Sequence, residues 1–501
     1  MSKKIKIYFT SDTHGYVFPI DYATGEKSAQ GVIGMGEKFI KDGNTLVIDG
    51  GDTIQGSPFT MYLSKLNFEE HPVALAMNKN QYDYVTLGNH DFNYGQDYLN
   101  KYIETLDAKV LCGNVDGLPI ATSDIKVLKN GLRVGIVGAV TDWINIWENP
   151  AHLNGLKVSD PMPAIKLELE KIRDQVDLTI CIYHGGYERN IDTDEIQSES
   201  GENIAWQICK ELDFDLLLTG HQHIPVAGKL VHGTYTVQPA NNGVHYLEID
   251  GIVSETGICF TSELKNGTDR FDPLGLNHLF AIEKDVQKWL DEPVGHLSQD
   301  LKADEKVTMA LNGSPIANFF NQVQLWATGA DISAASLGNV VKGFNRSVTV
   351  RDVVSTYVYS NTLTVVEING AKLKQILERA SSYLELDEAR QPQVSRSFLE
   401  PKIEHYNYDF FAGVTYTNTL NQPIGNRVSQ IRINGKEITE QDKFTLCINN
   451  YRATGAGGYD VIAECPVVKA YAVEMSELII DYLEVHKAVE IQAFQTPTYK
   501  F

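Results

Sequence analysis

Cysteine is scarce in this sequence, and long apolar runs are missing. The six cysteines include no C-x-x-C pair, so we expect buried, free thiols of the kind found in a reducing compartment. No stretch reaches the roughly 18 consecutive apolar residues that a membrane-spanning helix needs. The N-terminal apolar run stops at Phe9, which is too short for a signal peptide. These absences predict a cytoplasmic protein.

An excess of positive charge is also missing, since the formal net charge is −22. This balance argues against a nucleic acid polymer or an anionic membrane surface as the partner. It is still compatible with a small anionic substrate, because a bound metal ion can reverse the local field. The composition does not indicate an oligomeric state.

The chain shows no internal repeat and no low-complexity tract, and its 501 residues suggest two or three domains. In the first half, strand, polar loop and helix follow one another at least five times before residue 225. This rhythm predicts a layered α/β domain over 1–275, with both faces of its sheet covered. We expect a helical connector over 276–304, with a break at Pro293, and a separate α+β domain over 305–501.

The apolar spacing also predicts individual elements. Residues 31–41 and 471–487 have the apolar spacing of helices, and residues 252–264 resemble a single strand.

Five short motifs in the first half place polar side chains directly after predicted strands. They are SDTHG at 11–15, GGD at 50–52, LGNHDFNYG at 87–95, YHGG at 183–186 and GHQH at 220–223. The ends of strands are where ligands bind in open α/β sheets. Any one of these histidines alone is more often structural than functional. Five such motifs in this order are a much stronger indication of a site.

The donors in these motifs are oxygen and imidazole groups without thiolate. The candidate metal ligands are Asp12, His14, Asp52, Asn89, His184, His221 and His223. This set suits Mn, Zn, Fe or Co. Seven ligands are too many for one ion, but they suit two ions about 4 Å apart that share one carboxylate. Asp52 is the natural bridge, because the preceding glycines let the backbone approach the metals.

The five motifs together resemble those of the calcineurin-like metallophosphoesterases. In the second half, residues 449–460 (NNYRATGAGGYD) and 411–428 (FAGVTYTNTLNQPIGNRV) resemble the C-terminal domain of the 5′-nucleotidase and 2′,3′-cyclic-nucleotide 2′-phosphodiesterase family. The resemblance covers nearly the whole chain. It implies an α/β-β/α sandwich followed by a 5′-nucleotidase-type substrate-binding domain.

The resemblance also implies a division of roles among the site residues. One metal is expected on Asp12, His14, Asp52 and His223, and the other on Asp52, Asn89, His184 and His221. A hydroxide formed at the two metals would attack the phosphorus of the ester. His90 would not bind metal; it would stabilise the charge of the transition state or protonate the leaving group.

Asn93 departs from one branch of the resembled family. Typical 5′-nucleotidases carry an Asp three residues after the catalytic histidine, where this sequence has Asn93. An amide can orient the His90 ring but cannot stabilise its cation as a carboxylate does. Asp91 is adjacent in sequence but need not point toward the ring. The form GNH-acidic-FNYG therefore favours the cyclic phosphodiesterase branch, with 2′,3′-cyclic nucleotides or 3′-nucleotides as substrates.

The second half offers candidates for binding the substrate. Aromatic side chains that stack on the nucleobase are implied by the resemblance at Tyr408 and Tyr451, although Tyr406, Phe410 or Phe411 could replace Tyr408. Many 5′-nucleotidases carry a phosphate-binding loop that resembles Asn-Gly-Gly-x-x-Arg, and residues 336–353 of this sequence lack that pattern. The basic residues of this stretch, Lys342, Arg346 and Arg351, are more simply explained as solvated loop charges.

The sequence thus predicts a metal-dependent nucleotide phosphohydrolase, that is, a phosphoric ester hydrolase of nucleotide catabolism. A 5′-nucleotidase or nucleotide-sugar hydrolase is the alternative within the same class. A catalytically silent nucleotide-binding protein is the alternative from another class, although all seven candidate ligands and His90 are present.

Overall fold

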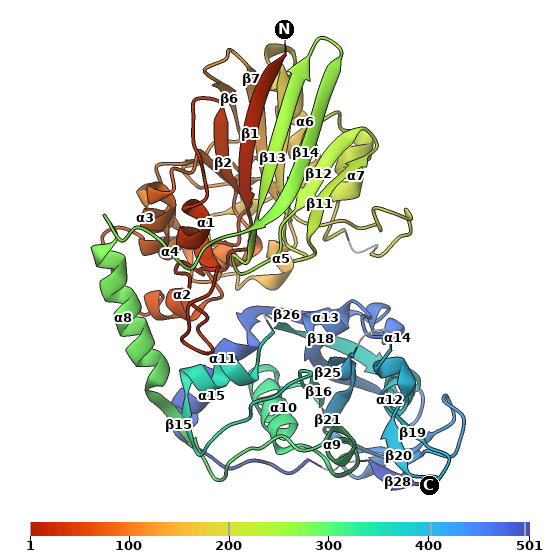
Figure 1. Cartoon of the computed structure of the whole chain (residues 1–501). Coiled ribbons are helices and arrows are strands. Elements are labelled where there is room, and N and C mark those ends of the chain that lie inside the picture. The colour runs from red at the N-terminus through yellow and green to blue at the C-terminus, as the bar shows by residue number, and fades with distance from the viewer. Residues whose placement is uncertain (1, 199–200, 360, 401–402, 495–496) are drawn as a thin grey trace. The chain divides into compact units, whose positions relative to one another are not determined.

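The chain forms two units, Met1–Lys288 and Trp289–Phe501 (Figure 1). The computed structural model describes residues 2–198, 201–359, 361–400, 403–494 and 497–501. The division between the units falls inside helix α8 (Asn277–Asp291).

The first sheet of the first unit begins the chain. Its strand order is β14-β13-β1-β2-β3-β4. The strands are β1 (Lys3–Thr10), β2 (Thr45–Asp49), β3 (Tyr84–Val85), β4 (Lys109–Val110), β13 (His245–Ser254) and β14 (Gly257–Asn266). β1 to β4 run parallel, and β13 closes back antiparallel on β1. The carboxyl ends of β1, β2 and β3 therefore lie at one edge.

The second sheet has the order β11-β12-β10-β9-β7-β6. Its strands are β6 (Ser123–Val127), β7 (Arg133–Val140), β9 (Leu178–His184), β10 (Leu216–Thr219), β11 (Val226–Val231) and β12 (Thr234–Gln238). β7, β9, β10 and β12 are parallel. A separate pair joins β5 (Val115–Asp116) to β8 (Lys157–Val158).

Alternation along β9 explains how this unit is layered. Ile180 and Ile182 belong to the core that the two sheets share, together with Ile7 and Ile48 of the first sheet. Cys181, on the opposite face, packs in a second core with residues of α6 (Pro161–Ile172) and α7 (Ala205–Glu211). Successive strand residues point to opposite faces, so the two apolar sets cover both sides of the strand. The predicted layered α/β-β/α architecture is confirmed.

The remaining helices of the first unit are short. They are α1 (Gly31–Gly36), α2 (Pro58–Leu63), α3 (Pro72–Lys79), η1 (Asn89–Phe92), α4 (Gln96–Thr105), α5 (Ile144–Trp147) and η2 (Arg173–Gln175). Ser57 caps α2 by accepting the backbone N–H of Thr60, and Asp160 caps α6 by accepting that of Met162. Proline at the first position of both helices fits this arrangement, because that position has no intrahelical N–H bond to lose.

The second unit contains the α+β domain that the sequence predicts. Its largest sheet has the order β21-β16-β25-β18-β26, beside sheets β24-β23-β22-β28, β17-β15-β27 and β19-β20. These strands are β15 (Pro293–Leu297), β16 (Ile332–Ser336), β17 (Ser347–Thr349), β18 (Thr362–Asn369), β19 (Leu384–Leu386), β20 (Pro392–Val394), β21 (Asp409–Ala412), β22 (Val414–Thr419), β23 (Val428–Ile433), β24 (Lys436–Glu437), β25 (Lys443–Asn449), β26 (Val467–Glu474), β27 (Ala488–Val489) and β28 (Thr498–Lys500).

Helices of the second unit cover these sheets (Figure 1). They are α9 (Lys306–Asn312), α10 (Pro315–Thr328), α11 (Val350–Thr356), α12 (Gly370–Ser381), η3 (Arg396–Phe398), η4 (His405–Asn407), α13 (Asn450–Ala453), α14 (Asp460–Ala463) and α15 (Met475–His486). Within the described ranges, no helix is both long and apolar enough to cross a bilayer.

Four sequence expectations differ from the structure. Residues 252–264 form a hairpin, because β13 ends at Ser254 and β14 starts at Gly257, whose φ of 129° favours glycine. The helix expected at 31–41 ends at Gly36. The helix expected at 471–487 starts only at Met475, because β26 extends to Glu474. The expected helical connector contains β15, which pairs with β17 and β27 of the second unit.

Candidate metal centre

The predicted ligands follow five strands of the first unit. Asp12 and His14 follow β1, Asp52 follows β2 and Asn89 follows β3, while His184 ends β9 and His221 and His223 follow β10. β1 to β3 are parallel neighbours in one sheet, as are β9 and β10 in the other. The topology thus brings the five motifs to the carboxyl edges of two packed sheets.

Glycines in the motifs allow these loops to touch. A Cβ on Gly51 would lie 2.3 Å from the backbone nitrogen of Gly88, and one on Gly220 would lie 2.6 Å from Oδ2 of Asp12. Both distances are shorter than atoms tolerate. The GGD loop and the GNH loop can therefore meet only when a side chain is absent.

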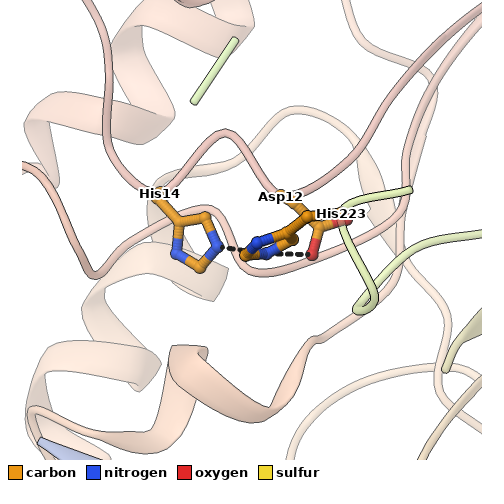
Figure 2. Close-up of side chains that lie close together, drawn as sticks. All are labelled: Asp12, His14 and His223. Atoms are coloured by element: carbon orange, nitrogen blue, oxygen red, sulfur yellow. Dashed lines mark hydrogen bonds and ion pairs between the residues drawn. The ribbon is translucent and has the colours of Figure 1, made fainter. Parts of the chain in front are cut away.

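The first cluster consists of Asp12, His14 and His223, whose ligand atoms lie within 4.8 Å of one another. Figure 2 shows the His223 ring between the other two side chains, with Nε2 of His223 lying 3.0 Å from Nε2 of His14 and 3.3 Å from Oδ1 of Asp12. Asp12 and His14 are buried. Three donor atoms converge on one point from two sheets.

The second cluster consists of Asp52, His184 and His221, again within 4.8 Å. Nε2 of His184 lies 3.2 Å from Oδ2 of Asp52. The two clusters are adjacent, because the backbone N–H of His221 donates to both carboxylate oxygens of Asp12, at 2.9 and 3.1 Å. Of the described residues, these two are the groups of three or more ionisable side chains that could hold a metal ion.

Second contacts of the histidine rings fix which nitrogen faces each cluster. Nδ1 of His14 lies 3.1 Å from the carbonyl of Gln55, and Nδ1 of His184 lies 2.7 Å from that of Gly50. Because a carbonyl only accepts, each Nδ1 carries the hydrogen and Nε2 faces the cluster. A ring N–H that donates to a carbonyl or carboxylate is the usual support of a metal-binding histidine.

Glu202 plays the same part for His221, and the sequence analysis did not identify it. Its Oε1 lies 2.8 Å from Nε2 of His221, which leaves Nδ1 of that ring for the cluster. Trp147 stacks on the ring at a centroid distance of 5.4 Å. Glu202 lies in a loop without a motif, so no sequence signal connects it to a histidine 19 positions later.

Buried polar atoms in the clusters test whether metal ions fit. Oδ1 of Asn89 is buried and has no hydrogen-bond partner within the described part of the chain, and the buried Oδ2 of Asp52 and Nε2 of His184 have only each other, at 3.2 Å. Such atoms are rare in folded proteins, because they lose water without replacement. All three belong to the predicted ligand set. Oxygen and imidazole donors of this kind suit divalent ions such as Mn, Zn, Fe or Co.

Backbone strain is concentrated at the same positions. Five of the seven predicted ligands have a left-handed φ between 48° and 73°, namely Asp12, His14, Asp52, His221 and His223. Residues with a Cβ seldom adopt this conformation, and it accumulates at functional sites that the surrounding fold holds in place. The loops thus hold these five ligand side chains in place through backbone conformations that cost stability.

Burial and neighbouring charges shift the pKa values of three ligands in the two clusters. Burial opposes ionisation of Asp12, but the hydrogen bond and charge of His223 and the charge of His184 lower its pKa to about 2. Burial opposes protonation of His184, yet the Asp52 carboxylate raises its pKa to about 10. For His14, burial dominates and lowers the pKa to about 3. The carboxylates therefore remain ionised and available to cations.

His90 lies beside this centre, as the sequence predicts. Its backbone N–H donates to Oδ1 of Asp52 at 2.7 Å, and its ring lies 5.3 Å from that of His14 in an edge-on arrangement. Nδ1 of His90 lies 2.8 Å from Oδ1 of Asn93. Asn93 therefore contacts the ring at the position where the sequence analysis expected an orienting group.

Asp91 does not contribute to that pair, because it points to the backbone. Its carboxylate accepts N–H groups from Asp52, Thr53, Ile54 and Gly88 at 2.7 to 3.0 Å. Burial and the charge of Asp52 raise its pKa to about 6 against the effect of these donors, so the group is ionised at neutral pH. Asp91 ties the GGD loop to the GNH loop.

In the second unit, Tyr408 does not fit the predicted role in base stacking. It is 6% exposed, stacks on Tyr383 at 4.3 Å and contacts Phe410 edge-on at 4.8 Å. Its ring belongs to the hydrophobic core. Several aromatic residues stand close together in this segment, and the sequence does not show which of their rings is buried.

Tyr451 is exposed on α13, with 42% of its surface accessible. Its neighbour Arg452 is buried, pairs with both carboxylate oxygens of Asp409 at 2.8 and 3.0 Å, and donates to the carbonyl of Tyr406 at 3.1 Å. Arg452 thus links Tyr451 to the partly exposed Tyr406. The role of Tyr451 stays a prediction.

The basic loop residues are partly neutralised by carboxylates. Lys342 pairs with Asp352 at 3.2 Å, and Arg351 pairs with Asp291 at 2.6 Å. The interpretation as a solvated loop charge holds for Lys342, which is about half exposed, but not for Arg351, which lies in α11 with only 16% of its side chain exposed.

Comparison with known proteins identifies the family. Residues 5–225 match the family described as calcineurin-like phosphoesterase, and residues 293–464 match the 5′-nucleotidase C-terminal domain. A solved structure from Staphylococcus aureus, provisionally named a 5′-nucleotidase and determined in complex with α-ketoglutarate, is 30% identical. The match covers 100% of both chains with a TM-score of 0.77.

Two curated relatives extend this comparison. The 2′,3′-cyclic-nucleotide 2′-phosphodiesterase/3′-nucleotidase of Haemophilus influenzae is 23% identical over 96% of this chain and 84% of its own length. The trifunctional nucleotide phosphoesterase protein YfkN of Bacillus subtilis is 24% identical over 98% of this chain, which spans only 38% of that protein. The chain therefore belongs to the calcineurin-like phosphoesterases that carry a 5′-nucleotidase C-terminal domain.

Proposed function

We propose that this chain is a metal-dependent nucleotide phosphohydrolase. The observation that supports the proposal most directly is the pair of adjacent clusters, Asp12–His14–His223 and Asp52–His184–His221, with His90 beside them. Relatives of this chain are named as cyclic phosphodiesterases, 3′-nucleotidases and 5′-nucleotidases. All of these are phosphoric ester hydrolases.

The chain's own residues supply binding and positioning. Asp12, His14, Asp52 and His223 would hold one divalent ion, and Asp52, Asn89, His184 and His221 the other. When bound, two such ions lower the pKa of a water molecule and draw negative charge from the phosphoryl oxygens. The carbonyl of Gln55 orients the ring of His14, and the carbonyl of Gly50 orients that of His184. The carboxylate of Glu202 orients the ring of His221.

His90 acts on the ester itself. Asn93 occupies Nδ1 of its ring, so Nε2 is the atom available to substrate. A hydrogen on that atom stabilises negative charge in the transition state or passes to the leaving oxygen. Because His90 is tied to Asp52 through its backbone N–H, its ring keeps a fixed place relative to the metal ligands.

Within this class we propose 2′,3′-cyclic nucleotides and 3′-nucleotides as the preferred substrates. Asn93, where a 5′-nucleotidase has aspartate, supports this choice. The exposed Tyr451 and the partly exposed Tyr406 are proposed to stack on the base, in place of the buried Tyr408. Stacking discriminates little between bases, so broad base specificity is expected.

A substrate panel tests the function. Phosphate release or ring opening should be measured with 2′,3′-cAMP, 3′-AMP and 5′-AMP, after removal of metal and readdition of Mn, Zn or Co. Turnover restored by metal and fastest on the first two substrates supports the proposal. Preference for 5′-AMP would identify a 5′-nucleotidase, and metal binding without any turnover would identify a silent nucleotide-binding protein.

A cytoplasmic location is proposed as well. All six cysteines lie in the described part of the chain and are free thiols, five of them buried. Free buried thiols are typical of proteins kept in reducing compartments. Cell fractionation tests this location, and recovery of the protein outside the cytoplasm would contradict it.

A further inference from the structure

A chain of hydrogen bonds continues beyond the pair formed by His90 and Asn93. Nδ2 of Asn93 donates to Oε2 of Glu148 at 2.7 Å. Oε1 of Glu148 accepts the backbone N–H of Asn149 at 2.6 Å and lies 2.9 Å from Nδ1 of His152. The amide of Asn93 therefore lies between the His90 ring and a carboxylate that is 55 positions away in the sequence.

The chemistry of Glu148 fixes the direction of this chain. A carboxylate only accepts hydrogen bonds, so the NH₂ group of Asn93 must face Glu148. The carbonyl oxygen of Asn93 must then face His90, and Nδ1 of His90 must donate to it. An amide without this partner could rotate by half a turn and donate to Nδ1 instead, which would select the opposite ring tautomer.

Glu148 is itself held firmly. Its side chain is buried, with the residue 6% exposed, and it follows α5, where its backbone N–H donates to the carbonyl of Ile144 at 2.9 Å. The preceding residue, Trp147, stacks on His221 of the second cluster. The segment that carries Glu148 is thus docked against the metal ligands as well as against Asn93.

We propose that Glu148 is a positioning residue for His90, which it orients through Asn93. The amide of Asn93 contacts the His90 ring where a carboxylate was expected, and the carboxylate of Glu148 contacts the other end of that amide. Because Glu148 only accepts, it fixes which end of the amide faces the ring. Glu148 keeps the hydrogen of the ring on Nδ1 and keeps Nε2 directed at the substrate. The catalytic consequence rests on the proposed function of His90, whereas the ring tautomer does not.

Glu148→Gln tests the proposal with almost no change of shape. A glutamine that accepts from Asn93 must present its NH₂ group to Asn149 and His152, where an acceptor is needed. We expect kcat to fall by about 10- to 100-fold, as for other partners that orient a functional histidine, with KM changed less than twofold. Glu170→Gln, at an exposed glutamate of α6, is the matched control and should leave both constants unchanged.

An exchange of the two groups separates positioning from general support of the fold. Asn93→Asp alone places two carboxylates in contact and should lower kcat at least tenfold. Asn93→Asp combined with Glu148→Gln restores one donor and one acceptor at the contact, so kcat should recover at least tenfold over either single variant. Losses that simply multiply in the double variant would show that the contact is not coupled and would overturn the proposal.

A spectroscopic readout is independent of turnover. In the zinc-loaded protein with ¹⁵N-labelled histidine, long-range ¹H–¹⁵N correlations report the tautomer of each ring, and His90→Ala assigns the His90 signals. We expect the hydrogen on Nδ1 in the native chain and a mixture of tautomers in Glu148→Gln. An unchanged His90 tautomer together with unchanged kcat would overturn the inference while leaving the proposed function intact. A native chain that shows the expected tautomers but hydrolyses no nucleotide would reject the function alone.

Discussion

Nε2 of His184 and Oδ2 of Asp52 lie 3.2 Å apart in the interior of the first unit. Nδ1 of His184 already donates to Gly50, so in the neutral ring a lone pair faces a carboxylate. Two acceptors this close require a positive charge between them. In the metal-free protein a proton supplies this charge. In the proposed enzyme a divalent ion bound by both residues would supply it.

Asp52→Ala is therefore expected to remove bound metal. The variant deletes the only carboxylate of the second cluster and the proposed bridge to the first. Elemental analysis after dialysis should show less than one ion per chain, against two in the native protein. Asp250→Ala, which removes an exposed partner of Lys6, is the control and should retain both ions. Two ions in Asp52→Ala would rule out the bridge.

His90→Ala is expected to separate chemistry from binding. The residue belongs to neither cluster, so metal content and the urea unfolding midpoint should remain native. Loss of a general acid or charge stabiliser lowers kcat by about 100-fold. His278→Ala, at an exposed histidine near the start of α8, should not change kcat. Native turnover in His90→Ala would exclude it from the mechanism.

His223→Gly is expected to stabilise the metal-free protein relative to His223→Ala. His223 has a φ of 58°, which costs a residue with a Cβ about 1 kcal/mol and costs glycine almost nothing. Both variants lose the same ligand, so their difference is the relieved strain minus the larger entropy that glycine loses on folding. Urea unfolding in the presence of a chelator measures it. An alanine variant that is equally or more stable would show that the strain at this position is no larger than the entropy cost of glycine.

Tyr451→Ala is expected to raise KM for nucleotides while leaving kcat within about twofold. Stacking on a base contributes about 1–3 kcal/mol in other nucleotide-binding proteins, which corresponds to roughly 5- to 150-fold in KM. Tyr451→Phe preserves the ring and should keep the native KM. Equal KM values for the alanine, phenylalanine and native proteins would remove Tyr451 from the binding site.

His71 makes stability depend on pH at a position outside the metal centre. The residue is buried among Phe68, Tyr98 and Tyr102, and its Nδ1 caps α3 by accepting the N–H of Val73. Burial lowers its pKa from 6.5 to about 3. Between these values the unfolded chain binds a proton that the folded chain does not. Stability contributed by His71 is therefore complete above pH 6.5 and decreases as pH falls.

The expected slope is about 1.4 kcal/mol per pH unit below pH 6.5. His71→Asn keeps an acceptor for the helix cap but does not titrate there. The free energy of unfolding of the metal-free native protein and of the variant should therefore converge as pH falls from 6.5 to 5. Parallel curves would show that His71 titrates normally in the fold.

Much of the metal site was predictable because its residues share a simple rule. Asp52, Asn89 and His184 each stand at or just after the end of a buried strand, and strand ends in parallel sheets converge. Glu148 and Glu202 stand in loops without that context. Only the packed fold brings them to Asn93 and His221, so no spacing in the sequence could reveal them.

Aromatic residues and turns were harder to predict for a different reason. Tyr408 and Tyr451 differ in burial, 6% against 42%, although both stand next to strands of the same sheet. Burial of a ring depends on what packs above it, which here includes Tyr383, a residue 25 positions earlier. The hairpin at 255–256 was missed because Glu255 and Thr256 are weak turn formers, and only Gly257 marks the reversal.

The carboxylate of Asp91 accepts hydrogen bonds from four backbone amides next to the metal ligands. The amides of Asp52, Thr53 and Ile54 join the GGD loop to the GNH loop through hydrogen bonds of the protein itself, so we expect the metal site to form when the chain folds. Far-ultraviolet circular dichroism should then be the same before and after metal loading. We therefore expect one divalent ion to replace another without unfolding of the chain.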